Sequence, residues 1–266
     1  MLGSIIGDIV GSPYEFARCK NFDFELLRPD AMWTDDSICT IAILEWLADG
    51  AEDSPQDYLL KWCRRYPNPK GGYGGRFLKW VNAVHPEPYN SWGNGAAMRC
   101  LPVAHFAQSY EDALILAKRS AEVTHNHPDG IIYTQATVLT GYFLLKGYGM
   151  RQIAELLPSL WPQIDVLNAP KPDELRPHYL YSEAIADTVL PCLSCVLWSD
   201  SFEATLRNGI SLGGDADTIG AIVGGLAECR YGVEGIPTVL LDYARRILPD
   251  DMKAVLARVP QYRDLF

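Results

Sequence analysis

Apolar residues recur at helical spacing along most of this chain, and this periodicity constrains the fold more than any other feature of the sequence. One such helical face follows Asp217 and consists of Ile219, Ile222, Val223, Leu226 and Ala227. The same spacing predicts helices at 36–48, 55–66, 94–107, 109–123, 133–146, 150–157, 183–198, 201–210 and 236–248. No stretch alternates polar and apolar residues for long enough to suggest a sheet. We therefore expect an all-α, compact multi-helix bundle that forms a single domain over residues 1–266.

Composition and charge limit the class of protein. The chain has 266 residues, of which 48% are hydrophobic, so it can bury a sizeable core. A net charge of −10 and the lack of a basic cluster argue against an extended nucleic-acid-binding surface, although a small nucleotide stays acceptable as a ligand. The seven scattered cysteines are typical of reduced thiols, and no apolar run approaches the ~18 residues that span a bilayer. These features predict a soluble, cytoplasmic protein.

Two groups of short oxygen-bearing side chains stand at the starts of apolar helices. The first group is Thr34, Asp35 and Asp36, and the second is Asp215, Asp217 and Thr218. The simpler interpretation is two ordinary N-caps, because Thr and Asp are favoured caps and an acid there complements the helix dipole. However, each helix is apolar on nearly all sides and is therefore predicted to be buried, so the four carboxylates would converge where water is scarce.

Divalent cations would remove that electrostatic conflict. Asp and Thr supply hard oxygen ligands, which suit Mg²⁺, Mn²⁺ or Ca²⁺ rather than zinc. Four acids are more than one ion requires, so the pattern favours a central binuclear site.

Glycine-rich and polar loops lie between the predicted helices. The segments 66–77 and 85–99 are rich in Gly, Pro and Asn beside aromatic residues, and 123–130 holds two of the five histidines. Such loops bring backbone close to ligands and commonly carry function. The polar segment 166–179 is interpreted as a turn region, with a partner-docking surface as its alternative.

Six motifs follow one another along the chain: "GDIVGSPYE", "TDDS", "GYGGRF", "SWGNGAAMR", "VTHNHPDG" and "LGGDADTIGAIVGG". They occur in the order found in ADP-ribosylglycohydrolases, and over roughly residues 1–235 the chain resembles that family. The resemblance implies an all-α fold and two divalent ions, Mg²⁺ or Mn²⁺, that grip the distal ribose of ADP-ribose. It also implies a ligand set of Thr34, Asp35, Asp36, Asp215, Asp217 and Thr218.

The resemblance also implies roles in catalysis and substrate binding. Glu15 matches a glutamate that closes near the scissile bond, although a surface acid is the simpler interpretation; Asp35 and Asp36 would stabilise the oxocarbenium-like state. The implied ADP-ribose-binding residues are Tyr73, Gly93, Asn94, Gly95, Met98 and His125. His125 would lie near the diphosphate, but taken alone it could equally cap a helix.

The sequence is compatible with three functions. The first is a monomeric, metal-dependent hydrolase that cleaves ADP-ribose from a protein or another acceptor. The second is a catalytically silent ADP-ribose-binding or structural protein on the same fold, which the complete set of metal-ligand candidates disfavours. The third is a metal-dependent phosphohydrolase of free nucleotides, which would release phosphate instead of ADP-ribose.

Overall fold

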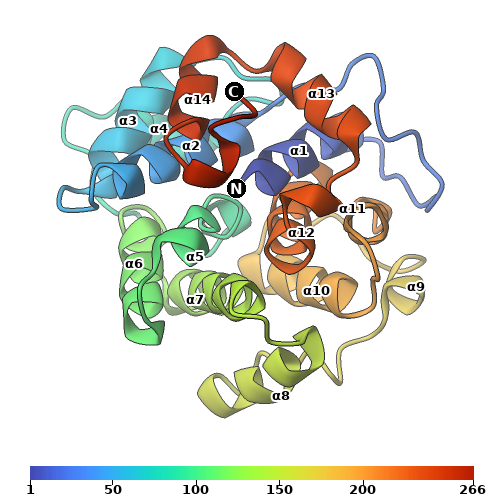
Figure 1. Ribbon diagram of the computed structural model, residues 1–266. Helices are drawn as coiled ribbons and strands as arrows, with labels where there is room; N and C mark the ends of the chain where they lie inside the picture. The colour runs from blue at the N-terminus through green and yellow to red at the C-terminus, as the bar shows by residue number, and fades with distance from the viewer.

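The computed structural model describes residues 1–266 and confirms an all-α fold (Figure 1). The α-helices are α1 (Leu2–Gly11), α2 (Asp35–Ala48), α3 (Pro55–Arg65), α4 (Gly75–Val81), α5 (Pro102–Phe106), α6 (Tyr110–Glu122), α7 (Pro128–Leu145), α8 (Met150–Leu160), α9 (Pro172–Leu175), α10 (Ile185–Leu197), α11 (Phe202–Ile210), α12 (Ala216–Tyr231), α13 (Thr238–Ile247) and α14 (Asp250–Leu256). Three short 3₁₀-helices join them: η1 (Asn94–Ala96), η2 (Val233–Gly235) and η3 (Pro260–Tyr262). Extended pairing is limited to two isolated bridges, Thr34 with Lys70 and Gly93 with Ala184.

The centre of the fold is the helix pair α1 and α12, which pack backbone against backbone. Gly3 and Gly7 on α1 face Gly224 and Gly220 on α12, and a Cβ atom at Gly7 would lie only 1.8 Å from the Gly220 carbonyl oxygen. Any side chain there would separate the helices, so glycine is required by the close approach. The pairing also brings the end of α1 to the start of α12, because Gly11 is in equally close contact with the Ala216 carbonyl.

The other helices surround this pair. Figure 1 shows α2, α3 and α4 to one side, α7 and α10 below α12, and α13 and α14 above it. All ten residues of α1 are buried, as are fourteen of the sixteen residues of α12. The buried apolar side chains form one continuous cluster of 74 residues, so every element that carries a candidate site residue is anchored in the same core.

The structure differs from the predicted helices at several places: α1, α4, α9 and α14 were not predicted, and one predicted helix is divided. The sequence 94–107 is not one helix, because η1 is followed by a turn and the new helix α5 begins at Pro102, where proline suits a first turn. Helical periodicity did not predict α1. Three glycines at four-residue spacing lower its intrinsic helix propensity, and only packing against α12 compensates for them.

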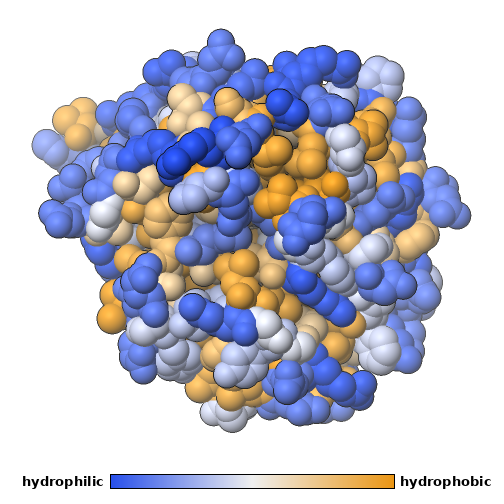
Figure 2. Space-filling model, in the orientation of Figure 1, coloured by the Kyte–Doolittle hydropathy of each residue, from blue (hydrophilic) through white to orange (hydrophobic).

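The molecular surface offers no single large apolar face in the view of Figure 2. Hydrophobic residues on this face form separate patches between polar ones. None of the helices combines the length and the hydropathy that crossing a membrane would require.

Candidate metal centre and ligand cleft

The two predicted carboxylate groups meet at one end of a cleft of about 370 Å³. The start of α2 supplies Asp35 and Asp36, and the start of α12 supplies Asp215, Asp217 and Thr218. The close α1–α12 contact lies beside them, since Gly11 touches Ala216. A volume of this size lies within the range of small-molecule sites. The cleft is therefore a candidate ligand site with an acidic end.

Ordinary helix capping explains only one of the two groups. The Thr34 hydroxyl accepts a hydrogen bond from the Asp36 backbone N–H at 3.2 Å, which is a normal N-cap contact. Asp215 occupies the N-cap position of α12, but its side chain caps no backbone N–H there. Instead, its Oδ2 atom accepts a hydrogen bond from the Asn94 side chain at 2.8 Å. The acid at the start of α12 is thus oriented toward the cleft rather than toward its own helix.

The carboxylate oxygens form two overlapping triads. One consists of Asp8, Asp36 and Asp217, and the other of Glu15, Asp215 and Asp217; within each triad one oxygen per residue lies within 4.8 Å of the others. None of these five acids forms an ion pair with a Lys or Arg side chain. Asp217 belongs to both triads, so this geometry is compatible with two neighbouring cation positions.

Burial and mutual repulsion disfavour the charged forms of these acids. Burial raises the pKa of Asp36, Asp215 and Asp217 well above the usual range, and the nearby carboxylates add to the increase. The buried Oδ1 atom of Asp36 has no hydrogen-bond partner at all. An orphaned, electron-rich oxygen in an all-oxygen donor set fits a hard divalent cation, which would restore the charged forms.

Asp8 is a member of the acidic cluster that the sequence analysis did not select. Its carboxylate accepts hydrogen bonds from the Thr34 backbone at 2.9 Å, from the Thr34 hydroxyl at 2.8 Å and from the Ser37 backbone at 3.1 Å, as well as from the Ser37 hydroxyl. Burial raises the pKa of Asp8 to about 6, although these bonds oppose the shift. Asp8 therefore joins α1 to the start of α2 and orients Thr34. A lone acid inside an apolar helical stretch was the available signal.

The remaining predicted ligands differ in burial and in whether their side-chain oxygens are already engaged in hydrogen bonds. Thr34 is fully buried behind the cleft, with its hydroxyl engaged by Asp8 and Asp36. Asp35 lines the cleft and is only partly buried by its neighbours. The Thr218 hydroxyl has no oxygen acceptor, since its nearest partner is the Met98 sulfur at 3.9 Å. Thr218 thus keeps its oxygen lone pairs available in the cleft.

Glu15 lies at the edge of the acidic end on the segment between α1 and α2. Burial, followed by the charge of Asp215, raises the pKa of Glu15 to about 7. Gly71 lies directly against it, because a Cβ atom there would be 2.9 Å from a Glu15 carboxylate oxygen. The backbone of Gly71 has φ +78°, a conformation that suits glycine, so the close approach and the conformation both require this residue.

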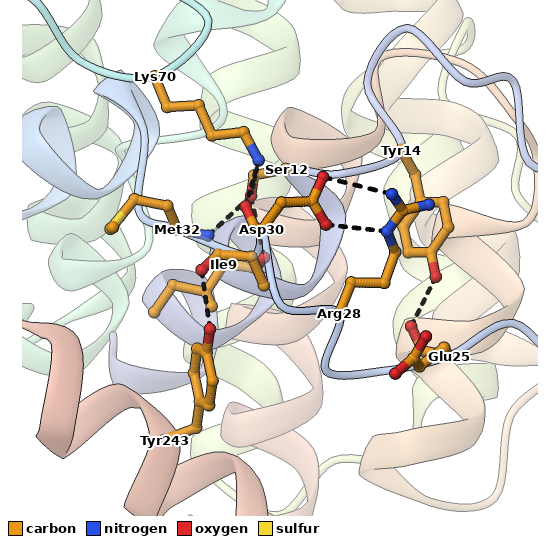
Figure 3. Close-up of polar contacts among 10 residues, drawn as sticks. Ile9, Ser12, Tyr14, Glu25, Arg28, Asp30, Met32, Lys70 and Tyr243 are labelled. Atoms are coloured by element: carbon orange, nitrogen blue, oxygen red, sulfur yellow. Dashed lines mark hydrogen bonds and ion pairs between the residues drawn. The ribbon is translucent and has the colours of Figure 1, made fainter.

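A hydrogen-bond network holds the Glu15 segment in place (Figure 3). The Ser12 hydroxyl donates to the Ile9 carbonyl at 3.1 Å and accepts from the Met32 N–H at 3.1 Å and from the Lys70 ammonium at 3.3 Å. Lys70 also donates to the Asp30 carbonyl at 2.6 Å. The segment that carries Glu15 is therefore tied both to α1 and to the glycine-rich segment 66–77.

The cleft wall beside the carboxylates is formed by the sequence around η1. Gly93, Asn94, Gly95 and Met98, for which the family resemblance implies ADP-ribose binding, all line the cleft. Asn94 links this wall to the acidic end through its bond to Asp215. The glycines allow close contact, since a Cβ atom at Gly95 would lie 3.3 Å from the His125 Nε2 atom.

The structure brings His125 and Tyr73 to the same cleft. His125 does not cap a helix; the neighbouring His127 is the N-cap of α7. Tyr73 contributes its side chain to the wall, but its hydroxyl donates to the Tyr66 carbonyl at 2.7 Å and is not free for a ligand. Two arginines that were not predicted, Arg76 and Arg99, also line the cleft. Burial lowers the pKa of His125 well below its ordinary value, and the nearby charges of Arg99 and Arg76 lower it further.

These features define the class of protein: an all-α architecture with an acidic cleft where three helix ends meet. Residues 1–264 match the family model described as ADP-ribosylglycohydrolase, and the chain belongs to this family.

Named relatives and a solved structure agree with this assignment. The chain is 29% identical to the ADP-ribosyl-[dinitrogen reductase] glycohydrolase of Rhodospirillum rubrum, over 89% of this chain and 86% of the relative. It is 24% identical to the ADP-ribosylarginine hydrolase Tri1 of Pseudomonas putida (strain GB-1), over 89% and 71%. It is 23% identical to the ADP-ribosylhydrolase ARH3 of Mus musculus, over 89% and 84%. A solved structure described as an ADP-ribosylglycohydrolase-related protein complex superimposes with a TM-score of 0.76 at 26% identity, covering 100% of this chain and 96% of that one.

Proposed function

We propose that this protein is a metal-dependent hydrolase that cleaves the glycosidic bond between ADP-ribose and an acceptor, and so reverses mono-ADP-ribosylation. The observation that carries the proposal is the pair of carboxylate triads without any basic partner at the end of a ligand-sized cleft. Similar proteins are named as hydrolases of ADP-ribosylated dinitrogen reductase and of ADP-ribosylarginine.

The proposed metal ligands are the six side chains Thr34, Asp35, Asp36, Asp215, Asp217 and Thr218. Two divalent ions, Mg²⁺ or Mn²⁺, would chelate adjacent hydroxyls of the distal ribose and thereby orient its anomeric carbon. Asp8 would act indirectly, since its carboxylate oxygens are already occupied by Thr34 and Ser37.

The chain's own side chains would contribute electrostatic stabilisation and positioning. Departure of the acceptor builds positive charge on the ribose ring, and the carboxylates of Asp35 and Asp36 would stabilise it. Glu15 stands at the edge of the same site beside Asp215 and Asp217, where its carboxyl group would hold or transfer a proton to the leaving group or the attacking water. Asn94 keeps Asp215 in its orientation through the 2.8 Å hydrogen bond.

The rest of the cleft would bind the ADP-ribose moiety. Gly93, Gly95, Met98, Tyr73 and His125 form its walls, and the glycines leave room for a diphosphate near the backbone. We also propose that residues 1–266 form one domain, which acts as a cytoplasmic monomer. All seven cysteines are free thiols, as expected for a reducing compartment.

Product analysis with a panel of ADP-ribosylated acceptors tests the proposal. The panel would include arginine-, serine- and nucleobase-linked ADP-ribose, each with Mg²⁺, with Mn²⁺ and with a chelator. We expect free ADP-ribose to appear from at least one acceptor and only with metal. Release of inorganic phosphate from a free nucleotide such as ADP, or of AMP and ribose 5-phosphate from ADP-ribose, would indicate the phosphohydrolase instead. Tight ADP-ribose binding without turnover of any acceptor would indicate a silent binding protein.

A further inference from the structure

Lys70 is a cation whose hydrogen bonds all go to neutral oxygen atoms. Its ammonium donates to the Ser12 hydroxyl at 3.3 Å and to the Asp30 carbonyl at 2.6 Å, and it forms no ion pair with a carboxylate. The Asp30 carboxylate binds the Arg28 guanidinium instead, at 2.9 and 3.3 Å (Figure 3). Hydrogen bonds from a charged donor are the stronger ones. Lys70 therefore connects segments of the chain and does not neutralise an acid.

The two oxygens that Lys70 binds belong to the two ends of the segment that carries Glu15. Ser12 directly follows α1 and precedes Glu15 by one turn of chain, and Asp30 stands shortly before the start of α2. One ammonium thus joins both ends of this segment to the glycine-rich segment 66–77. Contacts of this kind restrict how far the segment between them can move.

The backbone next to Lys70 forms the surface against which the Glu15 carboxylate lies. Gly71 follows Lys70 in the chain, and a Cβ atom on it would be 2.9 Å from a Glu15 carboxylate oxygen. The backbone of Lys70 is itself paired with that of Thr34 in an isolated bridge, so it has a fixed place beside the start of α2. The position of the Glu15 carboxylate is therefore bounded on one side by Ser12 and on the other by Gly71, and Lys70 holds both.

We propose that Lys70 is a positioning residue for Glu15: its ammonium ties Ser12 and Asp30 to the segment 66–77 and thereby sets the place of the Glu15 carboxylate relative to the proposed metal site. This inference rests on the proposed function, because it assigns Lys70 to the step in which Glu15 assists the leaving group or the attacking water. Lys70 does not line the cleft, and its ammonium donates to none of the six proposed metal ligands. It acts through Glu15, so its contribution is to turnover and not to binding.

Steady-state kinetics of the full-length protein on an accepted substrate test this role. We expect Lys70→Met, which keeps an unbranched apolar stem and removes the ammonium, to lower kcat about 10-fold while KM and the affinities for Mn²⁺ and ADP-ribose stay nearly unchanged. Lys70→Arg should recover most of kcat, because it keeps a charged donor. Lys61→Met is the matched control, since Lys61 links α3 to Glu45 of α2 at 2.6 Å without lining the cleft. Wild-type kcat in Lys70→Met, or a parallel loss of Mn²⁺ affinity, would overturn the inference.

A double variant distinguishes positioning of Glu15 from a general structural effect. If Lys70 acts through Glu15, the Glu15→Gln, Lys70→Met variant should have the same kcat as Glu15→Gln alone, because the group that Lys70 positions is already lost. Effects that multiply would show that the two residues act independently and would overturn the inference.

Amide hydrogen exchange of the protein without substrate tests the same contacts independently of activity. We expect faster exchange in the segments 12–20 and 66–74 of Lys70→Met and wild-type exchange there in Lys61→Met. Unchanged exchange in Lys70→Met would overturn the role of Lys70 and leave the proposed function intact. Wild-type protein that releases ADP-ribose from no acceptor would contradict the proposed function, whatever the exchange rates are.

Discussion

Asp217 is the residue on which both carboxylate triads depend. It shares one triad with Asp8 and Asp36 and the other with Glu15 and Asp215. Its Oδ1 atom accepts a hydrogen bond from the Thr218 backbone N–H at 3.0 Å, and an asparagine oxygen can accept the same bond. Removing its charge while keeping its shape should therefore affect both proposed cation positions without disturbing the helix start.

We expect Asp217→Asn to fold and to lose Mn²⁺ affinity by about 100-fold or more, since metal sites require the anionic oxygen. Without metal, the variant should be more stable than the wild type, with a melting temperature higher by about 3 °C, because one of several repelling carboxylates is gone. Calorimetry and thermal unfolding with and without Mn²⁺ measure both effects. Unchanged Mn²⁺ stoichiometry in an Asp35→Asn, Asp217→Asn double variant would refute the metal site.

Glu15 should contribute to turnover more than to binding. Glu15 belongs to one triad, but it is only partly buried and is not among the six proposed ligands. Glu15→Gln should therefore retain most of the Mn²⁺ content and ADP-ribose affinity. If Glu15 positions water or the leaving group, kcat should fall about 100-fold or more with little change in KM. Steady-state kinetics on an accepted substrate measure this, with Glu25→Gln as a control on the same segment. Normal turnover by Glu15→Gln would make Glu15 an ordinary surface acid.

At the scale of elements, the site is built by helix ends that the α1–α12 contact brings together. The contact requires glycine at Gly7 and Gly220, whose facing carbonyls leave no room for a side chain. Local sequence preferences oppose α1, because glycine is a poor helix former. The helix exists because its buried face is stabilised by α12, and this explains why periodicity alone did not predict it.

We expect Gly7→Ala to destabilise the fold by about 3 kcal/mol or more, since its Cβ atom must displace the backbone of α12. The melting temperature should fall by about 6–12 °C for a chain of this size. Mn²⁺ affinity should fall in parallel, because α1 carries Asp8. Gly149→Ala is the control, since its nearest neighbour is a side-chain oxygen at 3.4 Å and its φ is −69°. Equal stability of the two variants would contradict the proposed rigidity of the contact.

At the scale of the whole molecule, the two ends of the described chain meet in a buried polar cluster. The Glu228 carboxylate accepts from the Met1 ammonium at 2.5 Å and from the Gly3 N–H at 2.8 Å, and it also accepts from the Tyr262 hydroxyl. Burial alone would raise the pKa of Glu228, but the Met1 ammonium and His105 outweigh it and hold the pKa at about 2. This cluster joins α1, α12 and η3, so it couples the central helix pair to the C-terminal segment.

The pH dependence of stability should reflect this carboxylate. Because its pKa is lower in the folded state than in the unfolded state, Glu228 stabilises the fold above about pH 4.5. That contribution, of the order of a few kcal/mol, is lost as the pH falls from about 4.5 toward 2. Denaturant unfolding between pH 2 and 6 measures it. In Glu228→Gln the corresponding loss should be absent, and an identical pH profile for both proteins would contradict the assignment.

Acceptor recognition should depend mainly on the ADP-ribose moiety. The cleft residues with a proposed role are assigned to the metal ions, to catalysis or to ADP-ribose, and the molecule has no basic stripe for nucleic acid. We therefore expect similar KM values for a modified protein and for a short modified peptide, and inhibition by free ADP-ribose only when metal is present. The alternative is docking at a groove of about 770 Å³ that borders the segment 166–179 and shares Tyr181 with the cleft. A peptide that reacts far worse than the protein would favour that groove.

The sequence by itself determined the features that depend on local pattern. Helical periodicity predicted the all-α class and most helices, and the placement of Asp35, Asp36, Asp215 and Asp217 at helix starts predicted an acidic cluster that the structure does bring into one cleft. These inferences hold because helical periodicity and helix-start preferences both depend only on residues that are close together in the sequence.

Only the tertiary structure decided the features that depend on residues far apart in the chain. Asp8 joins the acidic cluster because glycine contacts bring α1 against α12, some 200 residues away in the sequence. Arg99 is buried in the cleft wall because the fold places it beside Ser120 and Thr124, to which its guanidinium donates. Both are set by burial and long-range proximity, and neither quantity is encoded in the spacing of neighbouring residues.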